Sequence, residues 1–80
     1  MRLNGFDLNQ LVCLEALLIE RNVSRAAERV HLSQSAMSWT LAKLREHFQD
    51  PLLVRSGRNL VVTPFARDLF GPVTELLTGA

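Results

Sequence analysis

The sequence has 80 residues, of which 48% are hydrophobic and 21% charged, and its formal net charge is +1. A chain of this length buries only about 60% of the surface that its unfolded form exposes. This favours one small domain, argues against most enzymes, and suggests that a partner or a second copy completes the core.

The longest apolar run, residues 11–19, contains Glu15 and is shorter than the ~20 residues of a membrane-spanning helix. Because no leader pattern is found and the lone Cys13 cannot form an internal disulfide, we expect a cytoplasmic protein.

The charges are distributed unevenly along the chain. Residues 21–58 hold seven basic and three acidic side chains, a net charge of +4, whereas residues 1–20 carry −2 and residues 59–80 carry −1. Clustered positive charge is typical of proteins that bind polyanions, although ordinary surfaces also show it.

Two helices are predicted in the N-terminal part. Asp7 is followed three residues later by Gln10 and then by an apolar run, an arrangement that caps the first turn of a helix. This helix should cover about residues 8–21, and the apolar side chains on nearly all of its sides predict a central position in the core. After a short break, Ser24 is expected to cap a second, short helix that ends at Val30.

A third helix is predicted to begin after Ser33, which is a good N-cap. The apolar side chains that recur at the spacing of one helix face are Met37, Leu41, Leu44 and Phe48. Two short helices joined by a few residues, the second of them amphipathic, make a helix-turn-helix pattern. The sequence therefore predicts a recognition helix over about residues 34–47.

The pattern changes after residue 51. Residues 52–54 and 60–62 are apolar triplets on either side of a four-residue turn that contains Gly57, which predicts a β-hairpin. A hairpin directly after a helix-turn-helix is a wing. The predicted fold is therefore mainly α, a winged helix-turn-helix over residues 1–63 with three helices and a two-stranded wing.

A last helix is predicted to begin after Thr63, which caps it with Pro64 in its first position. Gly71 and Pro72 are expected to interrupt and kink this helix. Its apolar side chains fit two interpretations equally well: a core helix of this domain, or a linker and dimerisation helix over residues 64–80. The candidate dimerisation residues are Phe65, Leu69, Val73, Leu76 and Leu77.

Catalysis and metal binding find little support in the residue pattern. Cys13 lies within an apolar helix, where a cysteine is usually a small core residue. His31 and His47 have no Cys, Asp or Glu partner at the spacing of metal ligands. The four glycines form no phosphate-binding loop. We therefore expect no enzyme activity, no metal and no cofactor.

The exposed side of the predicted third helix favours recognition of nucleic acid. At about 100° per residue, Trp39 lies roughly 190° from the inward apolar face, and its neighbours are small and polar. Such a surface fits a major groove, where Gln pairs with adenine, Ser bonds to base edges and a Trp edge can meet thymine methyl groups. The candidate base contacts are Gln34, Ser35, Ser38 and Trp39. Capping remains an alternative role for Ser35, and a contact with another protein remains one for Trp39.

Basic side chains on both sides of this helix are candidates for phosphate contacts. They are Arg25 and Arg29 on the second helix, Arg55 and Arg58 beside the wing turn, and Lys43 and Arg45 as secondary candidates in the third helix. The last two can instead interact with the negative C-terminal end of their own helix. Each of these cations, taken singly, also fits a merely solvated surface.

Six segments in a fixed order cover nearly the whole chain. They are residues 6–9 (FDLN), 22–27 (NVSRAA), 32–38 (LSQSAMS), 43–45 (KLR), 50–55 (DPLLVR) and 63–64 (TP). Together they resemble the N-terminal domain of LysR-type transcriptional regulators. Asp-Leu-Asn at residues 7–9 and Gly-Pro-Val at residues 71–73 are most similar to the branch that holds nodulation-gene activators and aromatic-catabolism regulators.

The resemblance implies a winged helix-turn-helix, a linker helix that pairs antiparallel with its twin in a homodimer, and a C-terminal effector-binding domain. The 80 residues hold no effector domain, so a small-molecule inducer is expected only for a domain missing from this sequence. The resemblance also implies base contacts by the four candidates of the third helix. The residues for which it implies phosphate or minor-groove contacts are Ser24, Arg25, Arg55 and Arg58, to which we add Ser33. Many members carry Pro where Ser35 stands, and Arg or a small residue where Trp39 stands.

The sequence thus predicts a domain that binds double-stranded DNA specifically, as a homodimer on an interrupted inverted repeat. Such a regulator would be associated with the nucleoid in the cytoplasm. The alternative is a protein-interaction module, because winged helices also dock on proteins. RNA binding is a weaker hypothesis, since single-stranded RNA needs several stacking platforms and only Trp39 is expected to be clearly exposed.

Overall fold

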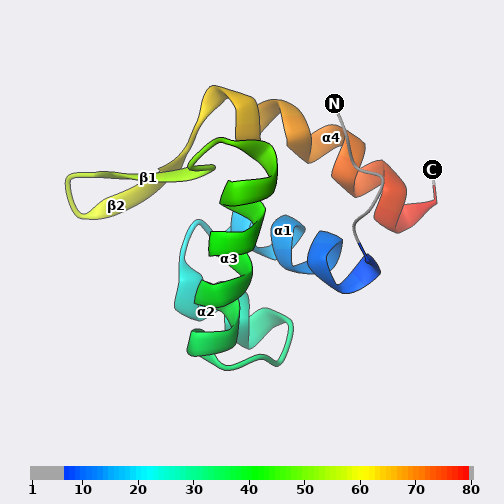
Figure 1. Cartoon of the computed structure of the whole chain (residues 1–80), viewed down its shortest axis with the longest axis horizontal. Helices are drawn as coiled ribbons and strands as arrows, with labels where there is room; N and C mark the ends of the chain where they lie inside the picture. The colour runs from blue at the N-terminus through cyan, green and yellow to red at the C-terminus, as the bar shows by residue number, and fades with distance from the viewer. Residues whose placement is uncertain (1–6, 80) are drawn as a thin grey trace.

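Four helices and one β-hairpin follow one another in the computed structural model, which describes residues 7–79. In chain order they are α1 (Leu8–Glu20), α2 (Val23–Arg29), α3 (Gln34–Phe48), β1 (Leu53–Ser56), β2 (Asn59–Val62) and α4 (Pro64–Thr78). The hairpin projects from the helices as a wing (Figure 1). The predicted mainly α, winged helix-turn-helix fold is confirmed. Phe6, the first residue of the first segment quoted above, lies outside the described residues.

Helix α1 lies at the centre of the core, as its nearly continuous apolar sequence predicts. It packs against each of the other three helices. The side chains with almost no exposure at these contacts include Leu14, Leu17, Met37, Leu44 and Leu69. Because each such burial contributes about 1.5–3 kcal/mol, this cluster is what holds α3 and α4 against α1.

Three predicted caps are confirmed. The side chains of Asp7, Ser33 and Thr63 accept hydrogen bonds from the backbone N–H three residues further on, at 2.8, 3.0 and 3.0 Å. Pro64 stands in the first turn of α4, where its missing N–H costs nothing. These caps set the starts of α1, α3 and α4.

The cap predicted for α2 is wrong. Asn22, rather than Ser24, caps this helix, because the Asn22 Oδ1 atom accepts the backbone N–H of Arg25 at 2.9 Å. Asn and Ser are about equally good caps, so the earlier of the two fits the helix start. Ser24 consequently lies in the first turn of α2 with its side chain exposed.

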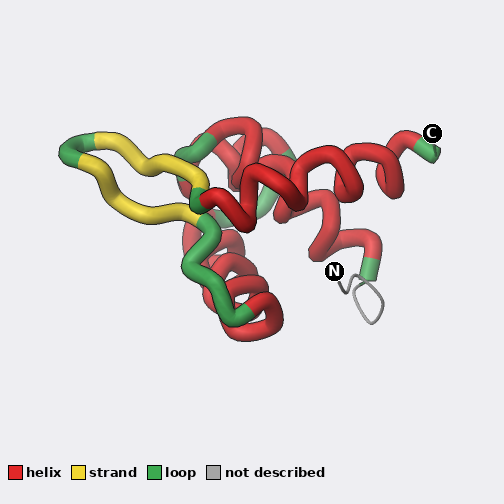
Figure 2. The backbone as a smooth tube through the Cα atoms, turned by 90° about the horizontal axis from the view of Figure 1, so that it is seen from above, coloured by secondary structure: helices red, strands yellow, loops and turns green. Residues whose placement is uncertain are grey.

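The wing is an antiparallel hairpin in which Leu53 pairs with Val62 and Ser56 pairs with Asn59. The strands are therefore longer than the predicted triplets, and the loop contains only Gly57 and Arg58. Gly57 has φ +63°, the backbone conformation that a two-residue hairpin loop asks of glycine in its first position. Seen from above, the wing extends away from the helices (Figure 2).

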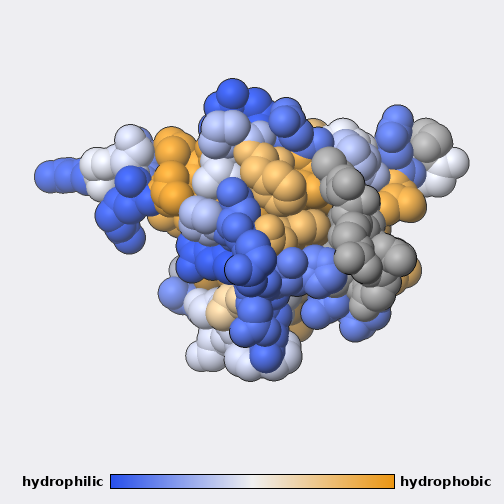
Figure 3. Space-filling view, turned by 45° about the horizontal axis from the view of Figure 1, so that its top comes forward, coloured by the Kyte–Doolittle hydropathy of each residue, from blue (hydrophilic) through white to orange (hydrophobic). Residues whose placement is uncertain are grey.

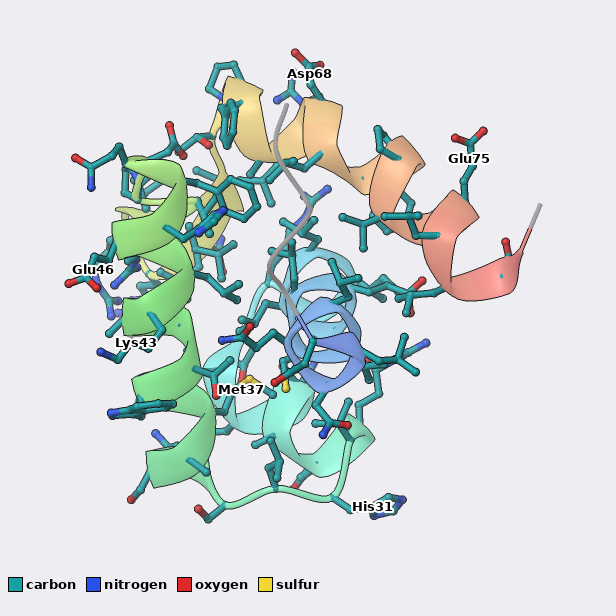
Figure 4. All side chains as sticks on the ribbon, turned by 45° about the vertical axis from the view of Figure 1, so that its right-hand side comes forward. His31, Met37, Lys43, Glu46, Asp68 and Glu75 are labelled. Carbon is teal, nitrogen blue, oxygen red and sulfur yellow. The ribbon has the colours of Figure 1, made fainter. Side chains whose placement is uncertain are left out.

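Helix α4 runs without a break from Pro64 to Thr78, so the expected interruption at Gly71 and Pro72 is wrong. Pro72 removes the donor to the Asp68 carbonyl, but Asp68 lies on the exposed side of the helix (Figure 4), where water can replace it. The helix also shares the core of the preceding elements and does not form a separate unit. No helix within residues 7–79 combines the length and apolar character required to cross a membrane.

Candidate nucleic-acid interface

The exposed side of α3 carries the four predicted base-contact residues. Gln34, Ser35, Ser38 and Trp39 are all exposed, whereas Met37 points from the same helix into the core (Figure 4). Hydroxyl and amide groups supply donors and acceptors without a formal charge. This surface therefore has the chemistry that base edges require.

Trp39 is 61% exposed and contacts Lys43, one turn further along α3. The Nζ atom of Lys43 lies 5.3 Å from the centroid of the Trp39 ring, which is a cation–π contact. Lys43 points away from the core (Figure 4). The ammonium and the indole therefore lie together on the exposed side of α3.

A shallow groove of about 330 Å³ lies where α2, the start of α3 and the wing meet. We call it the basic groove, and its polar and charged lining residues are Arg21, Asn22, Ser24, Gln34, Arg55, Arg58 and Asn59. Three arginines and no acidic side chain line it. Such a groove favours an anionic ligand. Because Gln34 lines the groove and also belongs to the exposed side of α3, the two surfaces adjoin each other.

The two wing arginines reach solvent from different parts of the hairpin. Arg55 lies in β1 opposite Leu60, and Arg58 lies in the loop. Both are exposed, and neither makes an ion pair with a carboxylate among residues 7–79. Figure 3 shows the hydrophilic surface at the tip of the wing. Their charges are therefore available to phosphate groups.

Other predicted phosphate contacts have partners inside the protein. The Nη1 atom of Arg29 lies 2.9 Å from the Oε2 atom of Glu20. The guanidinium of Arg45 donates to the carbonyl oxygens of Pro51 and Leu53, at 2.7 and 2.9 Å. Neither arginine lines the basic groove. Arg25 lines an adjoining depression beside it.

Three polar residues that line the basic groove, Arg21, Asn22 and Asn59, were not among the site residues predicted from the sequence. Arg21 ends α1 with φ 52° and lies directly before the cap of α2. Asn59 pairs with Ser56 at the end of the hairpin. Arg21 belongs to the basic block of residues 21–58, which is the one sequence feature that could have marked it as a site residue. No local pattern marks Asn59.

Cys13 is a core residue, as predicted, with 5% exposure. Burial, and secondarily the charge of Asp7, raises the pKa of its thiol. A thiol that stays protonated is a poor nucleophile. Among the described residues, no three His, Cys, Asp or Glu side chains gather as ligands of a metal ion.

The predicted dimerisation residues of α4 are divided between the core and the surface. Leu69 and Val73 have no exposure and belong to the core of this chain. Phe65 and Leu77 are partly buried against that core. Leu76 is 54% exposed, and Phe70, which was not predicted, is 39% exposed. Leu69 and Val73 therefore cannot face a partner in this fold.

Comparison with known proteins assigns this arrangement to a family. The family model of bacterial regulatory helix-turn-helix proteins, lysR family, matches residues 8–67. The chain belongs to the LysR family. The match includes α1, α2, α3, the wing and the start of α4, and the family is one of regulatory proteins rather than enzymes.

A curated relative in the LysR family is Nodulation protein D of Bradyrhizobium sp. (strain ANU 289). It is 53% identical over 77 residues, which cover 96% of this chain and 23% of the relative. The resemblance to nodulation regulators is thus confirmed. This LysR-family chain spans about a quarter of the length of the curated relatives that it matches.

Solved structures confirm the winged-helix fold of this LysR-family chain. A probable transcriptional regulator from Pseudomonas aeruginosa has a TM-score of 0.85 and 37% identity, covering 94% of this chain and 25% of that one. The CbnR DBD–DNA complex has a TM-score of 0.80 and 25% identity, covering 91% of this chain and 84% of that one.

Proposed function

We propose that this LysR-family domain binds double-stranded DNA sequence-specifically, with α3 in the major groove and the wing near the adjacent minor groove. The observation that carries the proposal is the position of the basic groove beside the exposed, uncharged side of α3. Cations for the backbone thus flank a surface suited to base edges. A likeness to the CbnR DBD–DNA complex supports this arrangement.

Two groups of side chains would contact the DNA, one at the base edges and the other at the phosphates. Gln34, Ser35, Ser38 and Trp39 would meet base edges and specify the sequence. The residues that would contact phosphates are Ser24 and Arg25 of α2, Arg55 and Arg58 of the wing, and secondarily Lys43. Phosphate contacts supply much of the affinity and the register, whereas base contacts supply the preference among sequences.

The proposal includes a homodimer. Exposed apolar side chains on α4, Phe70 and Leu76, would be covered by the same helix of a second copy. Two recognition helices related by a two-fold axis would then meet an interrupted inverted repeat, with half-sites offset by about one helical turn or a multiple of it. A regulator of this kind would work with the nucleoid in the cytoplasm.

Selection of binding sites from a pool of random duplexes, read by sequencing, tests this function. We expect enrichment of a pseudo-palindromic motif. The double variant Gln34→Ala, Ser38→Ala is the matched control: it keeps every candidate phosphate cation, so it should retain binding at low salt and lose the enrichment. Absence of DNA binding by the wild-type chain, even at low salt, would refute the proposal.

One observation favours a second candidate function, docking of a protein. Leu18, Ile19, Val62 and Phe70 line an apolar groove between α1, β2 and α4. Ile19 and Phe70 are 40% and 39% exposed. Loss of a protein partner on the change Ile19→Ser, in a chain that binds no DNA at low salt, would support this function instead.

A further inference from the structure

One side chain ties the wing to the recognition helix. Arg45 lies in the last turns of α3, and its Nε atom donates to the Pro51 carbonyl at 2.7 Å while its Nη2 atom donates to the Leu53 carbonyl at 2.9 Å. Leu53 is the first residue of β1. Figure 1 shows the end of α3 beside the start of the wing. A single guanidinium therefore spans the connection between the two elements.

The root of the wing has a strained backbone that depends on such contacts. Leu52 has φ +64°, which a side chain other than glycine seldom adopts, and it is buried. Its N–H donates to Asp50 Oδ2 at 2.8 Å, and its carbonyl accepts the N–H of Thr63 at 2.9 Å. Asp50 Oδ2 also accepts the Thr63 hydroxyl at 2.7 Å. Backbone of this kind persists only where its surroundings hold it, so the direction of the wing depends on the contacts made at its root.

An isolated two-stranded hairpin is marginally stable and needs neighbours to fix its direction. Beyond its root, the wing of this chain projects from the helices (Figure 2). A small rotation at the root would therefore displace Arg58 at the far end. The hydrogen bonds of Arg45 act at the point where such a rotation would begin.

We propose that Arg45 is a positioning residue for DNA binding: it fixes the angle between α3 and the wing, so that Arg55 and Arg58 meet phosphates while α3 lies in the major groove. This inference rests on the proposed function above. It replaces the direct phosphate contact that the sequence predicted for Arg45. The planar guanidinium suits this role because its donors have a fixed, forked geometry, which a lysine ammonium lacks.

A double-mutant cycle separates positioning from direct contact. The probe is the duplex enriched in the selection, and its Kd is measured by fluorescence anisotropy over a range of salt for four proteins: wild type, Arg45→Met, the double variant Arg55→Ala, Arg58→Ala, and the triple variant. We expect the double variant to lower the salt slope by about 3.6, the loss of two phosphate contacts in each copy of a dimer. Arg45→Met should weaken binding by a similar factor at each salt concentration and lower the slope by a similar amount. The triple variant should be no weaker than the double variant.

An additive result would overturn the inference. If Arg45→Met weakens binding by the same factor with and without the wing arginines, then Arg45 contacts DNA independently. If Arg45→Met binds DNA with the affinity of the wild type, then the hydrogen bonds of Arg45 do not position the wing, and the inference is wrong. Absence of wild-type binding would instead refute the proposed function itself.

Two further variants serve as experimental controls, and a separate measurement checks that each variant is folded. Arg45→Lys keeps the charge but cannot donate to both carbonyls in the same way, so it should weaken binding as Arg45→Met does; full binding by the lysine variant would contradict the inference. Arg67→Met removes an equal charge from α4, outside the basic groove, and should leave the Kd unchanged. Circular dichroism at the assay temperature checks folding, and Arg45→Lys can replace Arg45→Met in the cycle if the latter unfolds.

Discussion

Replacing Arg58 by alanine tests the electrostatic part of the proposed function directly. Arg58 occupies the two-residue loop of the wing, is exposed, and pairs with no carboxylate among the described residues. The substitution should therefore leave the core unchanged and remove one cation from the basic groove. Binding should weaken on all sequences, because a phosphate contact carries no base preference.

The size of the effect follows from counterion release. Each phosphate that a cation neutralises contributes about 0.9 to the slope of log affinity against log salt, so loss of Arg58 from both copies of a dimer lowers the slope by about 1.8. The ratio of wild-type to variant affinity should then shrink about twelvefold when salt rises from about 0.05 to about 0.2 M. A chain that binds as a monomer would show about half of this change in slope.

Fluorescence anisotropy with one specific and one unrelated duplex measures these quantities. Arg67→Ala serves as the matched control, because it removes the same charge at a position outside the basic groove. An unchanged salt slope for Arg58→Ala would refute the reasoning and remove Arg58 from the set of phosphate contacts. Weaker binding on the specific duplex alone would show that Arg58 reads bases instead.

Three further outcomes are expected. Trp39→Ala should change which bases are preferred and cost about 1–3 kcal/mol on the preferred site, as a repeated site selection would show; equal loss on every sequence would mean that the indole only stiffens the helix. Leu44→Ala should reduce the free energy of unfolding by about 2–5 kcal/mol, because Leu44 has no exposure; a drop below about 1 kcal/mol in urea unfolding would contradict its place in the core. Because burial raises the pKa of the Cys13 thiol, the folded state binds the proton more tightly than the unfolded state, and the free energy of unfolding should fall as pH rises above the ordinary thiol pKa. Cys13→Ala should remove that dependence, and an identical pH profile for both proteins would disprove the coupling.

Short-range signals were sufficient to predict most of the fold. Ser33 and Thr63 act as caps, Gly57 lies in the hairpin loop, and the i, i+4, i+7 spacing on α3 places Trp39 outside. Each of these features depends on residues within about two helical turns. The candidate base-contact surface could be predicted for the same reason, since it is one side of one helix.

Features of the structure that depend on contacts between elements could not be predicted from short-range sequence patterns. The sequence analysis predicted Ser24 as the cap of α2, whereas Asn22 caps the helix in the fold. Arg45 carries a charge suited to phosphate, yet its hydrogen bonds run to the backbone at the root of the wing. Arg21 enters the basic groove because α1 ends beside the wing, which no pattern around it reveals.

The exposure of the apolar side chains on α4 explains why its sequence fitted both a core helix and a dimerisation helix. Leu69, Val73 and Leu76 follow the i, i+4, i+7 spacing of one helix face. The first two have no exposure, whereas Leu76 is 54% exposed. The same face is therefore core where α1 covers it and surface near its C-terminal end. Periodicity identifies an apolar face but not what covers it, so the dimer proposed here must rest on the exposed side chains of Leu76 and Phe70 rather than on the whole stripe.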